Sequence, residues 1–255
     1  APAQKPLTDY VNPMLGTATL WDSVDLGFKP TKRTWGAEVF PGSSLPNAMV
    51  QVSPVTKFHS GAGYQYEDSV IYGFTHTNKG HWNLCHIPLL PVTGTPTPGD
   101  YCSPFSHERE SAAPGYYQVF LDRYGVDAQL SSTLRCAFHK YTYPAGAAAS
   151  LLADLQRSNE HVRAWDIRKE GDNVFAGWQQ TGEKMYFYAV ANRPVTGIEP
   201  VVEGDREVRI VRFGEGDGAL ELRIGFSFVS EKNARENLEA EMLGKSFAEV
   251  RSEAT

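Results

Sequence analysis

The segment from Gly73 to His86 holds more side chains capable of chemistry than a connecting loop needs. The side chains concerned are His76, Asn78, His81, Trp82, Asn83, Cys85 and His86. The segment lies between a strand-like run, 69–72, and a stiff apolar run, 87–91, and a loop held by rigid flanks often displays binding groups. The indole face of Trp82 suits the C–H face of a sugar, while amides and imidazoles can hydrogen-bond its hydroxyls. These residue types therefore predict a carbohydrate-binding loop.

Zinc binding is the alternative use of this segment, because His76, His81, Cys85 and His86 are all possible ligands. Structural zinc sites favour ligand pairs that are two to four residues apart and are followed by a second pair. Only His81 and Cys85 approach that spacing, and His76 stands alone upstream. The spacing favours imidazoles that hydrogen-bond the loop itself or a polar ligand. We therefore expect no stoichiometric zinc.

Paired carboxylates are the second place where chemistry could reside, since glycoside cleavage needs an acid and a base on either side of one bond. Glu67 and Asp68 are adjacent, so on a strand they point to opposite faces. Glu108 and Glu110 would lie on one face about 7 Å apart if extended, within the roughly 6.5–9.5 Å of inverting glycosidases. However, Arg109 separates them and prolines flank the segment. The prediction is a solvated, salt-bridged loop.

Bulk composition excludes several classes of function. The chain has 255 residues, 41% of them hydrophobic and 21% charged, which is typical of a globular protein. The net charge is −6 and no basic cluster occurs, so binding to nucleic-acid phosphates is not expected. No apolar run approaches the roughly 20 residues of a membrane-spanning helix.

The cysteine content and the first residues of the chain bear on the cellular compartment of the protein. Cys85, Cys102 and Cys136 allow at most one internal disulfide. The chain opens Ala1–Pro6 without an initiator methionine, as at a mature end after signal removal or at a cut made in cloning. The former would make the protein secreted or periplasmic.

Alternating patterns dominate the rest of the chain and predict strands. Residues 220–228 and 207–213 each alternate apolar with polar side chains, and the glycine-rich Gly214–Gly218 between them predicts a hairpin connection. Three runs predict an antiparallel meander: 116–122, 126–133 and 134–143. Further strands are predicted at 151–155, 173–179 and 184–191. More than ten short strands without a fixed repeat indicate a mostly β protein built as one large antiparallel β-sandwich.

Helices are predicted only near the end of the chain. Ser230 can cap a helix that begins at Glu231 and stops at Gly244, and Ser246 with Glu249 forms a capping box for a second helix. That second helix is short and has no evident partner on which to bury Phe247 and Val250. We therefore expect a sandwich domain over 1–229, linker helices over 230–255, and a polypeptide that was made longer.

The order of motifs along the chain resembles a known family. The motifs, in order, are 10–17 (YVNPMLGT), 40–42 (FPG), 49–54 (MVQVSP), 63–66 (GYQY), 71–76 (IYGFTH), 105–110 (FSHERE), 114–117 (PGYY), 138–144 (FHKYTYP) and 237–241 (NLEAE). Together they resemble the N-terminal β-sandwich domain of the family-92 glycoside hydrolases, which are calcium-dependent, exo-acting α-mannosidases. The resemblance covers essentially the whole chain.

This resemblance implies an enzyme that hydrolyses mannose-containing glycans with inversion. In the family an (α/α)-barrel follows the sandwich and carries the catalytic acid, the base and most calcium ligands, so no catalytic or metal-binding residue is assigned here and this segment alone is expected to be inactive. The implied role is to shape the substrate pocket, with Trp82 packing on the sugar and His76, His81 and Asn83 hydrogen-bonding it. The family's loop resembles His-Leu-Ser-Gly-x-Gly, and its replacement by 78–86 leaves the linkage specificity open.

Two other interpretations stay open at this point. One is a free-standing, lectin-like carbohydrate-binding sandwich without catalysis, and the other is a metal hydrolase centred on His81 and Cys85. The second helix, 247 onward, favours the mannosidase domain over the lectin, because a self-contained module would bury that helix or lack it. Binding of mannose by the chain alone would distinguish the lectin-like module from the mannosidase domain.

Overall fold

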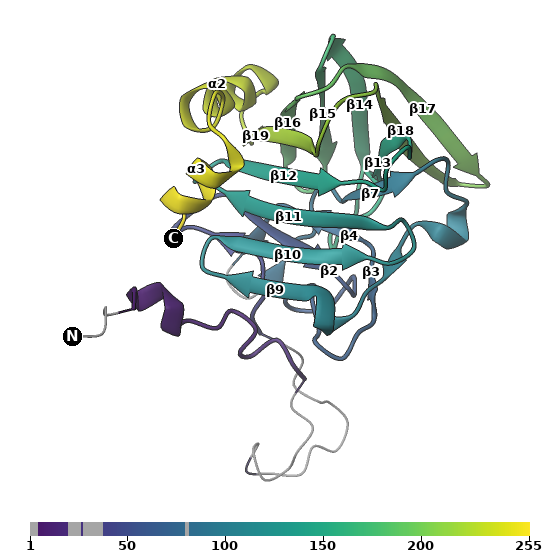
Figure 1. The fold of residues 1–255 in the computed structure, drawn as a ribbon. Helices are drawn as coiled ribbons and strands as arrows, with labels where there is room; N and C mark the ends of the chain where they lie inside the picture. Colours follow the sequence, from purple (N-terminus) through teal and green to yellow (C-terminus); the bar gives the residue numbers. More distant parts are fainter. Residues whose placement is uncertain (1–4, 20–26, 28–37, 80–81) are drawn as a thin grey trace.

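The computed structural model describes residues 5–19, 27, 38–79 and 82–255, and it shows two large antiparallel sheets packed face to face (Figure 1). Side chains from both sheets, such as Leu151 and Ile210 from one and Leu130 and Ile224 from the other, belong to a single buried core. The predicted mostly β sandwich is therefore confirmed. None of the helices in the described residues has the length and hydropathy needed to span a bilayer.

The eight-stranded sheet contains the predicted meander. Its strands, in spatial order, are β14 (Ala164–Gly171), β15 (Val174–Gln180), β16 (Lys184–Ala191), β19 (Leu220–Ser227), β12 (Cys136–Thr142), β11 (Val126–Ser132), β10 (Tyr116–Leu121) and β9 (Glu110–Ala113). Strand β16 alternates buried and half-buried residues along its whole length, as its sequence pattern requires. Consecutive strands β10, β11 and β12 pair antiparallel, which confirms the meander.

The seven-stranded sheet forms the second layer. Its strands, in spatial order, are β1 (Ser43–Ser44), β2 (Gln51–Val55), β4 (Gly73–Thr75), β7 (Leu89–Thr93), β13 (Ala149–Ala153), β18 (Arg206–Phe213) and β17 (Val195–Glu203). Two short pairs lie outside it: β3 (Val70–Ile71) with β8 (Ser103–Pro104), and β5 (Asn78–Lys79) with β6 (Trp82–Asn83). Three 3-10 helices complete the described part of the connections: η1 (Leu7–Tyr10), η2 (Pro98–Asp100) and η3 (His107–Arg109).

The predicted hairpin at Gly214–Gly218 is wrong. Strand β18 pairs with β13 and β17, whereas β19 pairs with β12 and β16, so the segment crosses from one sheet to the other. Glycine-rich composition marks a turn, and alternation marks one buried face on each strand. Neither signal says whether the two strands share a sheet, because strands of facing sheets bury the same kind of face.

The two helices begin where their caps predict, as α2 (Glu231–Glu241) and α3 (Phe247–Glu253). The expectation that α3 lacks a burial partner is wrong, since Phe247 and Val250 are both buried. They join Cys136, Phe138, Leu238 and Met242 in a second apolar cluster, and the rings of Phe138 and Phe247 meet edge to face at 5.2 Å. The helices cover the outer face of the eight-stranded sheet, a neighbour that the local sequence does not reveal.

Candidate functional site

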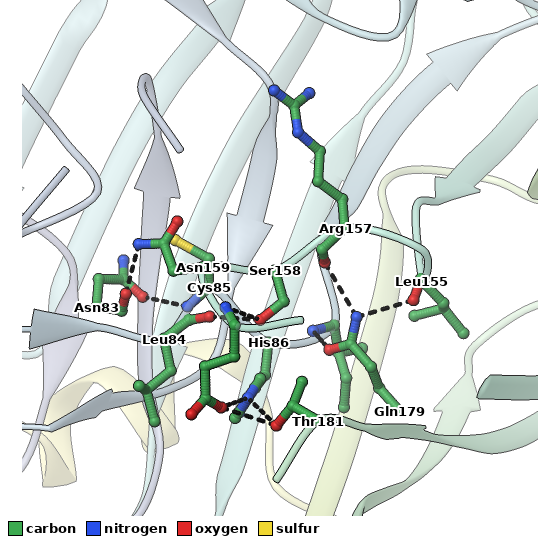
Figure 2. Close-up of polar contacts among 12 residues, drawn as sticks. Asn83, Leu84, Cys85, His86, Leu155, Arg157, Ser158, Asn159, Gln179 and Thr181 are labelled. Atoms are coloured by element: carbon green, nitrogen blue, oxygen red, sulfur yellow. Dashed lines mark hydrogen bonds and ion pairs between the residues drawn. The ribbon is translucent and has the colours of Figure 1, made fainter. Parts of the chain in front are cut away.

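The candidate site joins two segments that are far apart in sequence. One is the loop, residues 76–87, which contains the β5–β6 hairpin. The other is the strap, residues 155–160, which connects β13 to β14. Figure 2 shows the two segments facing each other and joined by several hydrogen bonds. Of the residues predicted to bind sugar, Trp82 lies in β6 with 43% of its surface exposed, and His81 lies outside the described residues.

His76 does not fit the predicted role of contacting a ligand, because its ring is fully buried. Its Nε2 lies 3.0 Å from Nε2 of His139, whose Nδ1 lies 2.6 Å from the Tyr141 hydroxyl. Nδ1 of His76 faces the carbonyl oxygen of His86 at 3.4 Å, so it must donate. One neutral chain satisfies these contacts: Tyr141 donates to His139, His139 to His76, and His76 to the loop backbone.

Burial keeps both of these histidines neutral. It lowers the pKa of His76 to about 3 and that of His139 well below its usual value, because an imidazolium would lose its hydration. The pair therefore anchors the loop at His86 and is not available to bind a ligand. The sequence offered no signal for this, since His139 belongs to a strand 63 residues away.

The side chain of Asn83 is also not free for the predicted role of binding a ligand. It is buried, its Oδ1 accepts the backbone N–H of Cys85 at 2.7 Å, and its Nδ2 donates to the carbonyl of Ala62 at 3.2 Å. This turn leads into two residues in the left-handed region, Cys85 and Ile87, each with a φ of 53°. Such a φ is strained for the β-branched Ile87, and strained backbone persists only where surrounding contacts hold it. Asn83 is thus part of what fixes the loop.

The thiols give little support to a metal centre. Cys85, Cys102 and Cys136 are all free, and burial raises the pKa of the Cys85 thiol well above its usual range. Cys85 is therefore a neutral, buried thiol and not a reactive thiolate. Within the described part of the chain, no group of three or more His, Cys, Asp or Glu side chains is placed to hold a metal ion.

His86 connects the loop to the strap. Its Nε2 lies 2.9 Å from Oε2 of Glu160 and 3.2 Å from the Thr181 hydroxyl, which itself donates to Glu160 at 2.7 Å. Burial lowers the pKa of His86, although Glu160 opposes that shift. Glu160 is partly exposed, with 40% of its side chain accessible. A carboxylate is thus oriented at the surface by a buried imidazole and a hydroxyl.

Gln179, on β15, links the two segments at their ends. Its side-chain carbonyl accepts the N–H of Ile87 at 2.8 Å, and its amide donates to the carbonyls of Leu155 and Arg157 at 2.9 and 3.0 Å (Figure 2). Gln179 is buried, so water cannot reach these backbone groups, and the side chain of Gln179 supplies their hydrogen bonds instead.

The strap adds further bonds to the loop. The Ser158 hydroxyl donates to the carbonyl of Leu84 at 2.8 Å, and Nδ2 of Asn159 donates to the carbonyl of Asn83 at 2.6 Å (Figure 2). Sequence reasoning missed Gln179 and the strap altogether. The run Arg157–Glu160, four polar residues after a buried strand, is the one signal that could have pointed to it.

A cleft of about 990 Å³ lies beside the strap, between residues 156–166 and residues 205–209. Four arginines and four carboxylates line it, together with Asn159, His59, His161 and Trp165. Asn159 belongs to the cleft wall and also binds the carbonyl of Asn83, the neighbour of Trp82. The backbone next to Trp82 is therefore bonded to the cleft wall. Mixed charges, amides and an aromatic ring suit a polyhydroxylated ligand better than an anion or an apolar molecule.

The prediction of a solvated loop around Glu108 and Glu110 is wrong for Glu110. The Glu110 side chain is only 2% exposed, accepts the hydroxyls of Tyr64 and Tyr117 at 2.9 and 2.6 Å, and lies 2.5 Å from Nδ1 of His107. Glu108 is exposed on η3. Glu110 is the first residue of β9, and its side chain points into the protein. The charged residues around it in the sequence gave no sign of this burial. The two carboxylates therefore do not form an acid–base pair.

The chain belongs to the family described as the glycosyl hydrolase family 92 N-terminal domain, whose profile matches residues 10–235. Among solved structures it is similar to a family GH92 α-mannosidase from Bacteroides thetaiotaomicron, at 26% identity and a TM-score of 0.82, with 98% of this chain and 37% of that chain covered. The complex of that enzyme with mannoimidazole gives the same identity and TM-score, with 36% of that chain covered. A search of curated proteins found no match.

A second similarity shows the fold alone. A family GH92 inverting mannosidase from the same organism has 22% identity and a TM-score of 0.79, with 98% of this chain and 36% of that chain covered. The chain therefore spans little more than a third of the length of the mannosidases it matches. The family named from the motifs is confirmed.

Proposed function

We propose that this chain is the sugar-facing N-terminal domain of an inverting exo-α-mannosidase that acts on mannose-containing glycans, such as N-glycans. The single observation that carries the proposal is the exposure of Trp82: its half-exposed indole stands on a loop that buried hydrogen bonds brace and that Asn159, a residue of the cleft wall, joins at the neighbouring Asn83. Membership of family 92 supports it, as does the similar α-mannosidase that was solved with mannoimidazole.

The division of labour between this chain and the rest of the enzyme follows from what the described residues offer. Inverting hydrolysis needs a carboxylic acid to protonate the leaving oxygen and a carboxylate to activate water on the opposite face of the sugar. The carboxylates of Glu108 and Glu110 are split between surface and core and cannot act on one bond. We assign both catalytic groups to the further chain that the similar mannosidases carry, and positioning of the sugar to Trp82.

Calcium belongs to the same proposal. The described residues do not fit such a site, because no group of three acidic, histidine or cysteine side chains is placed to hold an ion. No step is therefore assigned to calcium here, and we propose that its ligands lie mainly in the catalytic domain. Because complex glycans are met outside the cytoplasm, we propose a secreted or periplasmic location.

The test is Trp82→Ala in the full-length protein, assayed on α-mannobiosides. A geometrically specific contact with an aromatic ring is worth up to about 1.5 kcal/mol beyond its buried area, and about 1.4 kcal/mol corresponds to a tenfold loss in kcat/KM. We expect at least that loss with an unchanged melting temperature, because the indole is half exposed. The control is Leu134→Ala, which is exposed to a similar extent at 46% and should change neither quantity. A large fall in melting temperature with unaltered kinetics would show that the indole has a structural role.

The lectin-like module is the second candidate, and one observation favours it. Helix α3 is buried, so it no longer argues against a self-contained domain. Calorimetric titration of the 255-residue chain with mannose and mannobiose decides between the two. Strong binding by the chain alone favours the lectin, whereas binding that requires the further domain favours the mannosidase.

A further inference from the structure

Three connections that cross between the two sheets meet at one end of the sandwich. They are residues 143–148 (β12 to β13), 192–194 (β16 to β17) and 214–219 (β18 to β19). A pocket of about 320 Å³ lies between them, and we call it the end pocket; it is lined by residues 146–149, Arg193 and residues 213–216. That volume is near the lower end of the range for ligand sites, so it suits a small molecule.

The end pocket is separate from the cleft beside the strap. Strand β18 begins at Arg206, which lines the cleft, and ends at Phe213, which lines the end pocket. A rise of about 3.3 Å per residue along this strand places the two residues about 23 Å apart. A small ligand in the end pocket would therefore not contact a sugar held in the cleft.

Arg193 brings a buried positive charge to the end pocket. Only 9% of the residue is exposed, and a guanidinium stays charged at every physiological pH. One Nη atom donates to the carbonyl of Gly218, whereas the Nε–H is buried and has no acceptor in the part of the chain that the structure describes. Among those same residues, no carboxylate lies within ion-pair distance of Arg193.

The arginines of the neighbouring strand β18 are all paired, although their side chains are 20–35% exposed. The pairs are Arg206 with Asp154, Arg209 with Glu207, and Arg212 with Glu199. Burial of a charge is costly unless an opposite charge compensates it. Arg193 is more buried and lacks that compensation, which an anion from outside the chain would supply.

The other residues of the end pocket indicate which kind of anion fits. Phe213 and Ala147–Ala149 offer only apolar side-chain atoms, which suit a carbon body. Glu215, an exposed residue that also lines the pocket, repels a dianion such as phosphate more strongly than a monoanion. A guanidinium and a carboxylate form strong, charge-assisted hydrogen bonds. We propose that the end pocket binds a small organic carboxylate, with its acid group on Arg193 and its carbon body against Phe213.

Gly216 offers a way to move the guanidinium without changing any charge. A Cβ atom at this position would lie 2.8 Å from Nε and 2.9 Å from Cδ of Arg193, closer than such atoms approach in proteins. Gly216→Ala therefore displaces the Arg193 side chain and should disturb the site while the net charge stays the same.

The test is calorimetric titration of the 255-residue chain with benzoate, with the neutral, isosteric benzamide as the control ligand. We expect one benzoate per chain with a Kd of about 1 mM or below, and binding of benzamide that is at least about tenfold weaker. Arg193→Gln and Gly216→Ala should each weaken benzoate binding by about tenfold or more. The control variant is Arg235→Gln, which removes an exposed arginine of α2 and should leave benzoate binding unchanged.

Several outcomes would overturn the inference. Absence of benzoate binding, or equal binding of benzamide, would show that the pocket does not recognise an acid group. Unchanged affinity in Arg193→Gln and in Gly216→Ala would place the ligand elsewhere, and tighter binding of inorganic phosphate at equal ionic strength would refute the choice of a carboxylate.

Glu215→Gln tests whether the chain itself supplies the counter-charge. We expect an unchanged melting temperature and benzoate binding at least as tight as in the wild type. A lower melting temperature, with benzoate bound only by this variant, would show that Glu215 pairs with Arg193 and would overturn the inference. No mannoside enters these measurements, so their result stands apart from that of the proposed function.

Discussion

Two regions of the molecule are held together by opposite means. One is the loop with its strap. The other is the helical corner, which is formed by α2, α3 and the outer face of β12. The helical corner is an apolar cluster in which Phe138, Leu238 and Phe247 exclude water. The loop and strap are joined by polar side chains, among them His86, Asn83 and Gln179. The comparison teaches that a segment rich in reactive residue types need not be a reactive segment. Most of those side chains are used to hold a strained backbone, and Trp82 alone of the described predicted residues is left at the surface.

The energetic consequences differ as well. An apolar cluster loses stability roughly with the volume removed, since its contacts are not directional. A buried polar network loses stability when a single partner is removed, because each donor or acceptor that it bonded is left buried without a hydrogen bond. The following variants test whether the two regions obey these separate rules.

Phe247→Ala should have the largest effect. The ring is buried against Phe138, and truncation of a buried phenylalanine costs about 3–5 kcal/mol. Urea unfolding of the 255-residue chain measures it, with Leu243→Ala, which is exposed, as a control expected to change stability by less than about 0.5 kcal/mol. A loss below about 1 kcal/mol would mean that α3 does not pack on the sheet.

Gln179→Ala should come next, at about 3 kcal/mol, because it leaves the N–H of Ile87 and two strap carbonyls without partners. The matched control is Gln180→Ala, the adjacent and half-buried residue of β15, for which we expect less than about 1 kcal/mol. Equal losses for the two glutamines would contradict the idea that directional bonds hold the loop.

Acid should weaken the loop side more than the helical corner. The folded-state pKa values of His76 and His139 lie below the unfolded value of about 6.5. Their contribution to stability is therefore complete above pH 6.5 and is lost as the pH falls, continuing for His76 down to about 3. Unfolding free energies between pH 7 and pH 4 should fall less steeply in His139→Gln. His161→Gln, at an exposed position, should keep the wild-type slope, and identical slopes for all three proteins would refute the assignment.

Ser246→Ala should have the smallest effect, about 1 kcal/mol, since it removes one N-cap from an otherwise packed helix. The cap hydroxyl accepts the N–H of Glu249 at 3.2 Å, so Ser246→Thr should restore most of the loss. A loss as large as that of Phe247→Ala would show that capping, and not apolar burial, holds the helical corner.

Much of the fold was predictable because its signals are local. Alternation identified strands such as Lys184–Ala191 to the residue, and Ser230 and Ser246 marked the starts of both helices. The ordered motifs between Tyr10 and Glu241 identified the family. Each of these features is set by side chains within a few residues of one another, where backbone preference and periodicity act.

Partners and burial were decided only by the tertiary structure. His76 is neutral because the fold buries it, with His139 from 63 positions away against its ring, and the N–H of Ile87 is bonded by Gln179 from 92 positions away. The carboxylate of Glu110 is buried where it accepts the hydroxyls of Tyr64 and Tyr117. Helix α3 is buried against a sheet face whose residues lie more than a hundred positions earlier in the sequence. A residue's type sets which bonds it can make, whereas the packing of distant strands sets which bonds it does make and whether any capacity is left for a ligand.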